Sequence, residues 1–149
     1  MTYKPNLRRK PQILFLGPTN TARTLMAEAY GREYLADLAK VRSVGMRAGN
    51  QDERTLAVLR EDGIDTSSLK PKDLDAEVLE WADLIVTLTQ NPSTLPAPRG
   101  DSFISKNWPM EIPKEPSGME QDLETHRRCR EEIKRRIRQL ANSIRLMQR

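Results

Sequence analysis

Residues 17–23, Gly-Pro-Thr-Asn-Thr-Ala-Arg, form the part of this sequence best suited to chemistry, because they can bind an oxyanion. A short apolar run at 12–16 precedes them and a helical pattern follows. In such a strand–loop–helix unit, backbone N–H groups point at a phosphate and the helix N-terminus adds partial positive charge. Arg23 would lie in the first helical turn, where its guanidinium can form paired bonds to an anion. The alternative is an ordinary surface arginine.

The pattern around this loop predicts an α/β fold. Short apolar runs that end at turn residues predict buried strands, and apolar residues spaced three and four apart predict helices. Strands that alternate with helices indicate a parallel sheet covered on both faces. We expect strands at 12–16, 40–44, 84–88 and 102–104, and helices around 25–34, 54–61, 73–81 and 119–149. Thr19, Asn20 and Thr21 offer side chains that could cap the first helix.

Composition excludes several classes of protein. At 37% hydrophobic and 31% charged residues, the chain is expected to fold in water. No apolar run approaches the ~18 residues of a membrane span, and residues 1–11 are basic without the apolar segment of a signal peptide. The single cysteine, Cys129, excludes an internal disulfide and a thiolate metal cluster. We therefore expect a cytoplasmic protein without a metal or cofactor, made of a basic tail (1–11) and one domain (12–149).

The formal net charge of +4 arises largely from the arginine-rich residues 127–149. One interpretation is a solvated helix face, and the other is attraction to nucleic acid or to a phosphorylated partner. His126, the only histidine, has no evident metal co-ligands and is expected on the surface or on a helix face. Trp81 is expected in the core, and Tyr30 on the packing side of the first helix.

The segment 13–29, ILFLGPTNTARTLMAEA, resembles the active-site segment of low-molecular-weight protein tyrosine phosphatases and of the thioredoxin-linked arsenate reductases that share their fold. That family carries Cys-x5-Arg, then Ser or Thr, and usually Met-Ala-Glu. The likeness continues in the same order through 43–45, 58–65, 82–87, 108–113 and the last helix. The resemblance implies a three-layer α/β/α fold with a four-stranded parallel sheet, a single phosphotyrosine phosphatase I-like domain over 12–149 and a long C-terminal helix.

The departures from the family pattern concern the reacting groups. Gly17 stands where the family has its nucleophilic cysteine, and Ile112, just before Pro113, stands where it has the general-acid aspartate. The two further cysteines of the arsenate reductases would fall near Thr89 and Leu95, and both are absent. Thr19 replaces a glycine of the loop.

The binding half of the family's site is retained. Arg23 matches the arginine that clamps the anion, Asn20 the asparagine that braces the loop, and Thr24 the hydroxyl that steadies the thiolate. The resemblance therefore implies an anion site without catalytic residues. Its expected members are Thr19, Asn20, Thr21, Ala22, Arg23 and Thr24.

Three functions fit this pattern. The first is a pseudophosphatase that binds phosphate, sulfate or a phosphorylated ligand without turnover. The second is an interaction or scaffolding module, or a homodimer, formed through the basic C-terminal helix, where Ile144 and Met147 continue the apolar stripe. The third is a phosphatase with residual activity, or one inactivated by an engineered Gly17. Nucleic acid and membrane are not the expected partners.

Overall fold

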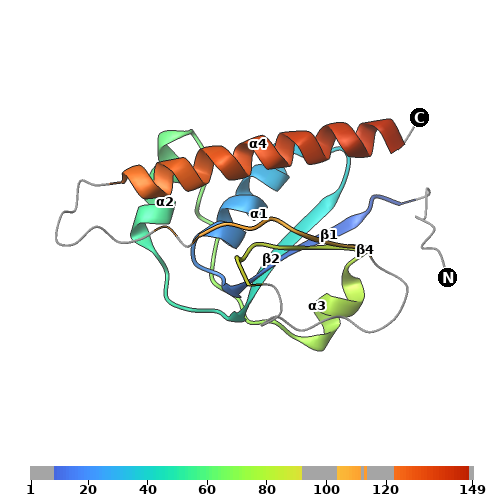
Figure 1. Cartoon of the computed structure of the whole chain (residues 1–149), viewed down its shortest axis with the longest axis horizontal. Helices are drawn as coiled ribbons and strands as arrows, with labels where there is room; N and C mark the ends of the chain where they lie inside the picture. The colour runs from blue at the N-terminus through green and yellow to red at the C-terminus, as the bar shows by residue number, and fades with distance from the viewer. Residues whose placement is uncertain (1–8, 92–103, 112, 114–122, 148–149) are drawn as a thin grey trace.

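A parallel sheet between two layers of helices forms the framework of the protein (Figure 1). This computed structural model describes residues 9–91, 104–111, 113 and 123–147. The elements follow the order β1 (Gln12–Thr19), α1 (Arg23–Tyr34), β2 (Lys40–Arg47), α2 (Glu53–Glu61), α3 (Ala76–Trp81), β3 (Leu84–Thr87), β4 (Ile104–Asn107) and α4 (Glu124–Met147). The four strands lie in the order β2-β1-β3-β4, and each neighbouring pair is parallel. The predicted α/β class with four parallel strands is confirmed.

Alternating side chains of β1 explain why both faces of the sheet are covered. Ile13 and Phe15 belong to the larger core cluster, which includes residues of α1, α2 and α4. Leu14 and Leu16 point to the opposite face and pack with Val78 of α3. Figure 1 shows α4 lying along one side of the sheet and α3 on the other. Within the described residues, no helix is long and apolar enough to cross a bilayer.

Several predicted boundaries are wrong by a few residues. β1 and β2 do not stop before Gly17 and Gly45 but pair through them, so that Thr19 lies opposite Arg47. The predicted helix from residue 73 begins only at Ala76, because the Asp75 side chain accepts the Val78 N–H at 2.8 Å and caps it. The last strand lies at 104–107, where residues 102 and 103 are outside the described part.

An ion pair ties the N-terminal end of the described chain to the fold. Arg9, in the predicted basic tail, donates to both carboxylate oxygens of Asp83 at 2.7 and 2.8 Å. The long last helix is described from Glu124 to Met147, whereas the sequence analysis predicted 119–149; residues 119–122, 148 and 149 lie outside the described part.

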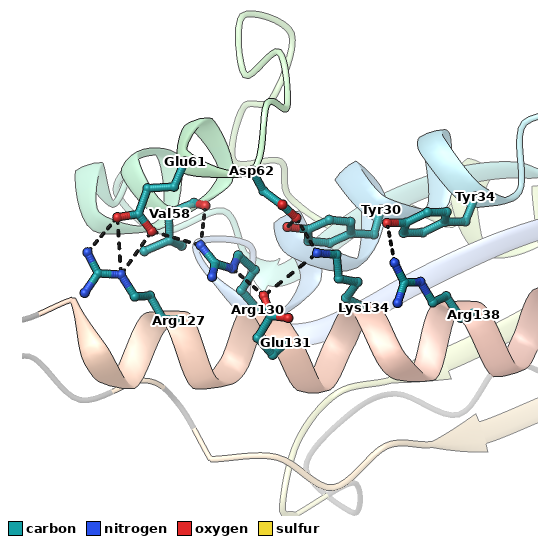
Figure 2. Close-up of polar contacts among 10 residues, drawn as sticks. All are labelled: Tyr30, Tyr34, Val58, Glu61, Asp62, Arg127, Arg130, Glu131, Lys134 and Arg138. Atoms are coloured by element: carbon teal, nitrogen blue, oxygen red, sulfur yellow. Dashed lines mark hydrogen bonds and ion pairs between the residues drawn. The ribbon is translucent and has the colours of Figure 1, made fainter.

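Four basic side chains of α4 are directed toward α2 and α1 (Figure 2). Arg127 and Arg130 bind Glu61, with shortest distances of 2.6 and 2.9 Å. Further along, Lys134 binds Asp62 at 2.7 Å, next to the Tyr30 hydroxyl, and Arg138 donates to Tyr34 Oη at 3.2 Å. This part of the positive charge is therefore used within the molecule to hold α4 against its neighbours.

Candidate functional site

The predicted loop begins inside the sheet. Gly17 lies opposite Gly45 in the β1–β2 ladder, and the ladder continues to Thr19. A Cβ at Gly17 would meet Thr24 Cγ2 at 3.0 Å and the carbonyl oxygens of Thr19 and Leu88 at 3.3 and 3.6 Å. A small side chain would therefore require Thr24 to shift by a few tenths of an ångström. The glycine itself offers neither a nucleophile nor an acid.

Asn20 braces the turn between β1 and α1. Its buried side-chain amide donates to Thr24 Oγ1 at 2.7 Å and to Ser43 Oγ at 3.0 Å, and its Oδ1 accepts the Lys72 N–H at 3.0 Å. The backbone N–H of Asn20 donates to the Ala48 carbonyl at 3.0 Å. This N–H is consequently engaged inside the protein in the present conformation, while the amide links three separate segments.

A buried carboxylate continues this brace. Glu28, which is 1% exposed, accepts from Ser43 Oγ at 2.6 Å and from Lys72 Nζ at 3.2 Å, and it also pairs with Arg32. The acid is thus fully compensated, as a buried charge must be. Its role is to hold the Asn20 network in place from the far side of Ser43.

Arg23 opens α1 as a buried cation. Only 6% of its surface is exposed, and Nη1 donates to the Met110 carbonyl at 2.8 Å. Within the described residues, no carboxylate forms an ion pair with it. Burial lowers the pKa of the guanidinium, and the nearby Cys129 acts in the opposite sense. A charge held in this way would gain from an anion beside it.

The N-terminus of α1 is left open by its neighbours. The N-cap residue is Ala22, and no side chain caps the helix, so the expected capping by Thr19, Asn20 or Thr21 is wrong. Instead the hydroxyls of Thr19 and Thr21 lie 3.3 Å apart, and Thr24 Oγ1 lies 3.4 Å from the Thr19 carbonyl. The first N–H groups of α1 therefore keep the electrostatic character that attracts anions.

A groove runs beside this end of α1. Thr21 and Ala22 line it together with the residues that start α2 and precede α4: Asn50, Gln51, Asp52, Glu53, Arg54, Ala57, Pro113 and Leu123. The N-termini of three helices thus border one depression.

The predicted general-acid position, Ile112, lies outside the described residues. Its neighbour Glu111 is exposed. Trp108 is buried, and its ring lies 5.9 Å from that of Phe15. Trp81, expected in the core, is only partly buried, and the Arg42 guanidinium lies 4.4 Å above its ring.

His126 lies on a helix, as one of its two predicted placements had it, but the helix face that carries it is buried. It is 1% exposed rather than on the surface, and Nε2 lies 2.8 Å from Asp52 Oδ2. Burial acts to raise the pKa of Asp52, but the bonds from His126, Thr55 and the Arg54 N–H outweigh it and hold that pKa low. The one feature of the sequence that could have indicated this contact was Asp52, because it is a good capping residue ahead of a helical pattern.

Cys129 lies on α4, and its thiol keeps its proton at neutral pH. Burial raises its pKa to about 12, although the charge of Arg23 acts to lower it. A thiol in this state is a poor nucleophile. Among the described residues, no group of three or more His, Cys, Asp or Glu side chains could hold a metal ion.

Comparison with known proteins supports the family resemblance that the sequence predicted, over nearly the whole chain. The family described as low molecular weight phosphotyrosine protein phosphatase matches residues 12–149. An arsenate reductase of Halalkalibacterium halodurans is 31% identical over 135 residues, which cover 90% of this chain and 97% of the relative.

Solved structures agree with the sequence comparison. An arsenate reductase from Archaeoglobus fulgidus has a TM-score of 0.68 at 30% identity, covering 87% of this chain and 98% of that one. An arsenate reductase in the phosphate-binding state has a TM-score of 0.76 at 25% identity, covering 90% and 98%. This chain therefore belongs to the low-molecular-weight phosphotyrosine protein phosphatase family.

Proposed function

We propose that this protein is a pseudophosphatase that binds an oxyanion at the start of α1 without turning it over. The observation that carries the proposal is Arg23, a guanidinium that is 6% exposed and has no ion-pair partner among the described residues. Buried charges in proteins are normally paired. Phosphate, sulfate or a phosphorylated ligand would supply the missing charge.

The surroundings of Arg23 favour an anion further. The helix lacks a side-chain cap, and its first intrahelical bond runs from the Met26 N–H to the Ala22 carbonyl. The preceding N–H groups are therefore the natural second contact for an oxyanion. A relative of the same fold has been solved in a phosphate-binding state, which supports the same ligand class for this chain.

The absence of turnover follows from the residues that replace the reacting groups. Gly17 has no side chain, and the protonated Cys129 thiol is not activated. Loss of a thiolate also changes binding: two like charges 4 Å apart repel by about 4 kcal/mol at an effective dielectric constant of 20. A loop without that thiolate should bind an anion more tightly. The greater backbone freedom of glycine reduces this gain in affinity.

Calorimetric titration with phosphate and with sulfate tests the proposal. Removal of the charge in Arg23→Ala should weaken binding by roughly 30-fold or more, since hydrogen bonds to a charged group contribute about 2 kcal/mol. Arg23→Lys should recover part of the affinity as a point charge. Arg145→Ala is the matched control, because this arginine is exposed and donates to Asn142 Oδ1 at 3.3 Å within the same helix. No anion binding by the native chain, or equal binding by Arg23→Ala, contradicts the proposal.

A second candidate function is protein interaction through the end of α4. Leu146 and Met147 are 65% and 62% exposed, whereas Ile144 is buried in the core. Truncation would remove Ile144 as well, so Leu146→Ser with Met147→Ser is the cleaner variant. This function predicts that the native chain has a dimer mass in solution, or captures a partner, and that the double variant does not.

A further inference from the structure

We propose that the outer edge of β2 binds an extended, acidic segment of a partner protein as a further strand of the sheet. β2 is an edge strand, because the strands lie in the order β2-β1-β3-β4. Extended peptides add to such edges through backbone hydrogen bonds, while their side chains provide specificity. This surface does not include Arg23, so it can be tested independently of the anion site.

Alternate residues of β2 turn their backbone N–H and C=O groups away from β1. The Lys40 N–H donates to the Pro11 carbonyl at 2.9 Å, so the even-numbered residues from 40 to 44 bond toward β1 and the odd-numbered residues point outward. At Gly45 the outward groups are already used. Its N–H donates to the Lys72 carbonyl at 3.0 Å, and its carbonyl accepts the Leu74 N–H at 2.8 Å. This edge therefore pairs with an added segment at one of its ends.

The outward backbone groups of Val41 and Ser43 lack such a partner. Among the residues that the structure describes, no hydrogen bond engages the N–H or the carbonyl of either one. Ser43 is also fully buried, and buried backbone groups without partners are rare in folded proteins. A strand that continues the line of residues 72–74 would supply partners to both.

A cavity of about 490 Å³ lies along this part of β2 and is bordered by residues 41–44. Glu28 and Lys72 line it on the α1 side of the sheet, and Val78 of α3 lines it on the other. Side chains of a strand alternate between the two faces. An added strand with acids at every second position would therefore direct them toward Lys72 and direct its apolar residues toward Val78.

The Lys72 side chain lies across the edge at Ser43. The Lys72 backbone is bonded to Gly45, while its Nζ lies 3.2 Å from Glu28 Oε1, the oxygen that accepts from Ser43 Oγ at 2.6 Å. The side chain therefore spans the distance from Gly45 to the neighbourhood of Ser43. Lysines in this position protect edges against unspecific pairing, so a strand must move Lys72 before it can pair with Ser43.

A carboxylate on the incoming strand can draw Lys72 aside. The Lys72 side chain is 41% exposed, and Glu28 also pairs with Arg32, which remains when the lysine leaves. The buried acid thus stays compensated while the ammonium exchanges one carboxylate for another. Arg42, which also lines the cavity, has no carboxylate partner within the described ranges and favours an acidic strand further.

The other acids of the cavity oppose this strand only in part. Asp73 and Asp75 each accept a backbone N–H, at 2.7 and 2.8 Å, and these bonds offset part of their charge. Glu77 belongs to α3 and so lies on the side that would receive the apolar residues of the strand.

Titration of the native chain, followed through its backbone amide NMR signals, tests the proposal. The probe is the peptide acetyl-Val-Glu-Val-Glu-Val-amide, which should shift the signals of Val41 and Ser43. Two further peptides carry N-methyl groups on either the odd or the even positions. Only one of these two should bind, because an added strand uses the N–H groups of one edge. Unchanged Val41 and Ser43 signals at millimolar peptide, or equal binding by both N-methylated peptides, would overturn the proposal.

Lys72→Met tests the choice of an acidic partner. Replacement of both Glu residues of the peptide by Gln should weaken its binding to the native chain about three- to fivefold, as for an exposed ion pair. Lys72→Met keeps the length of the side chain and removes its charge, so the two peptides should bind this variant alike. Lys106→Met, on the opposite edge strand β4, is the matched control and should retain the native preference. Equal binding of both peptides by the native chain would overturn the acidic partner.

Discussion

His126 Nε2 lies 2.8 Å from Asp52 Oδ2 and joins the first turn of α4 to the start of α2. The same carboxylate caps α2 by accepting the Arg54 N–H and the Thr55 hydroxyl, each at 3.0 Å. The other ring nitrogen of His126, Nδ1, is buried without a hydrogen-bond partner among the described residues, so Nε2 is the ring atom that makes the contact. One acid thus fixes two helix ends beside the groove that borders α1.

Loss of the contact between His126 and Asp52 should destabilise the protein. His126→Ala removes a buried ring and its bond, so we expect the free energy of unfolding to fall by about 2–4 kcal/mol. Urea denaturation followed by circular dichroism measures the change. His126→Gln, which keeps a side-chain N–H donor, should recover part of it. A loss below about 0.5 kcal/mol in His126→Ala, typical of a surface site, contradicts this prediction.

The two paired glycines should differ sharply in their tolerance of a methyl group. A Cβ at Gly45 would lie 2.3 Å from the Arg47 carbonyl oxygen and 2.5 Å from the Thr19 carbonyl carbon, and neither backbone atom can move freely. At Gly17 the closest atom is the Thr24 methyl at 3.0 Å. We expect Gly45→Ala to cost about 3 kcal/mol or more and Gly17→Ala less than about 1 kcal/mol. Equal losses in denaturant unfolding of the two variants would contradict the close approach at Gly45.

The same glycines explain where sequence reasoning succeeded and where it failed. Apolar runs predicted the strands and the parallel sheet, because burial on both faces leaves continuous β-branched and leucine-rich segments. Gly17 and Gly45 were interpreted as strand ends. In the structure they lie opposite each other, and the missing side chain at Gly45 lets the two backbones run close together.

Contacts between distant residues account for the remaining errors. Arg23 and Met110 lie 87 positions apart, and Asp52 and His126 lie 74 apart. No local pattern reports such a pairing, so the burial of His126 could not be predicted. The Arg23 position itself was accessible from the sequence because it depends on a strand–loop–helix order, which is local.

The decrease of the free energy of unfolding at acid pH should depend on Glu61. Its hydrogen bond with Arg127 is the main cause that lowers its pKa from 4.5 to about 2; desolvation opposes this effect, and Arg130 adds to it. A carboxyl whose pKa is lowered in the folded state stabilises the protein above its unfolded pKa. That contribution is lost as the pH falls from 4.5 toward 2.

Glu61→Gln isolates this contribution. The variant should be less stable than the native chain at pH 7, and the difference should shrink by pH 3. Because Glu61 is exposed, 1 M NaCl should reduce the difference at pH 7 as well. Thermal unfolding at both pH values gives the comparison, and a native–variant difference independent of both pH and salt contradicts the assignment.

The native chain should not hydrolyse p-nitrophenyl phosphate above the uncatalysed rate. Loss of a covalent nucleophile costs on the order of 10⁶ in rate, and loss of a general acid removes roughly a further 10²–10⁴. Gly17→Cys combined with Ile112→Asp restores the two groups that the family pattern carries at these positions, and Thr24 needs only a small shift to admit the new Cβ. We therefore expect turnover in the double variant.

Arg23 decides how that experiment is interpreted. Addition of Arg23→Ala to the double variant should abolish its turnover, since the buried guanidinium is the group proposed to hold the phosphoryl oxygens, whereas Arg145→Ala should leave it intact. Arg23-dependent turnover by the native chain would show that the protein is an enzyme after all. A double variant that binds phosphate but stays inactive would show instead that β1, which runs as a strand through Thr19, holds the loop in a form that positions the anion away from residue 17.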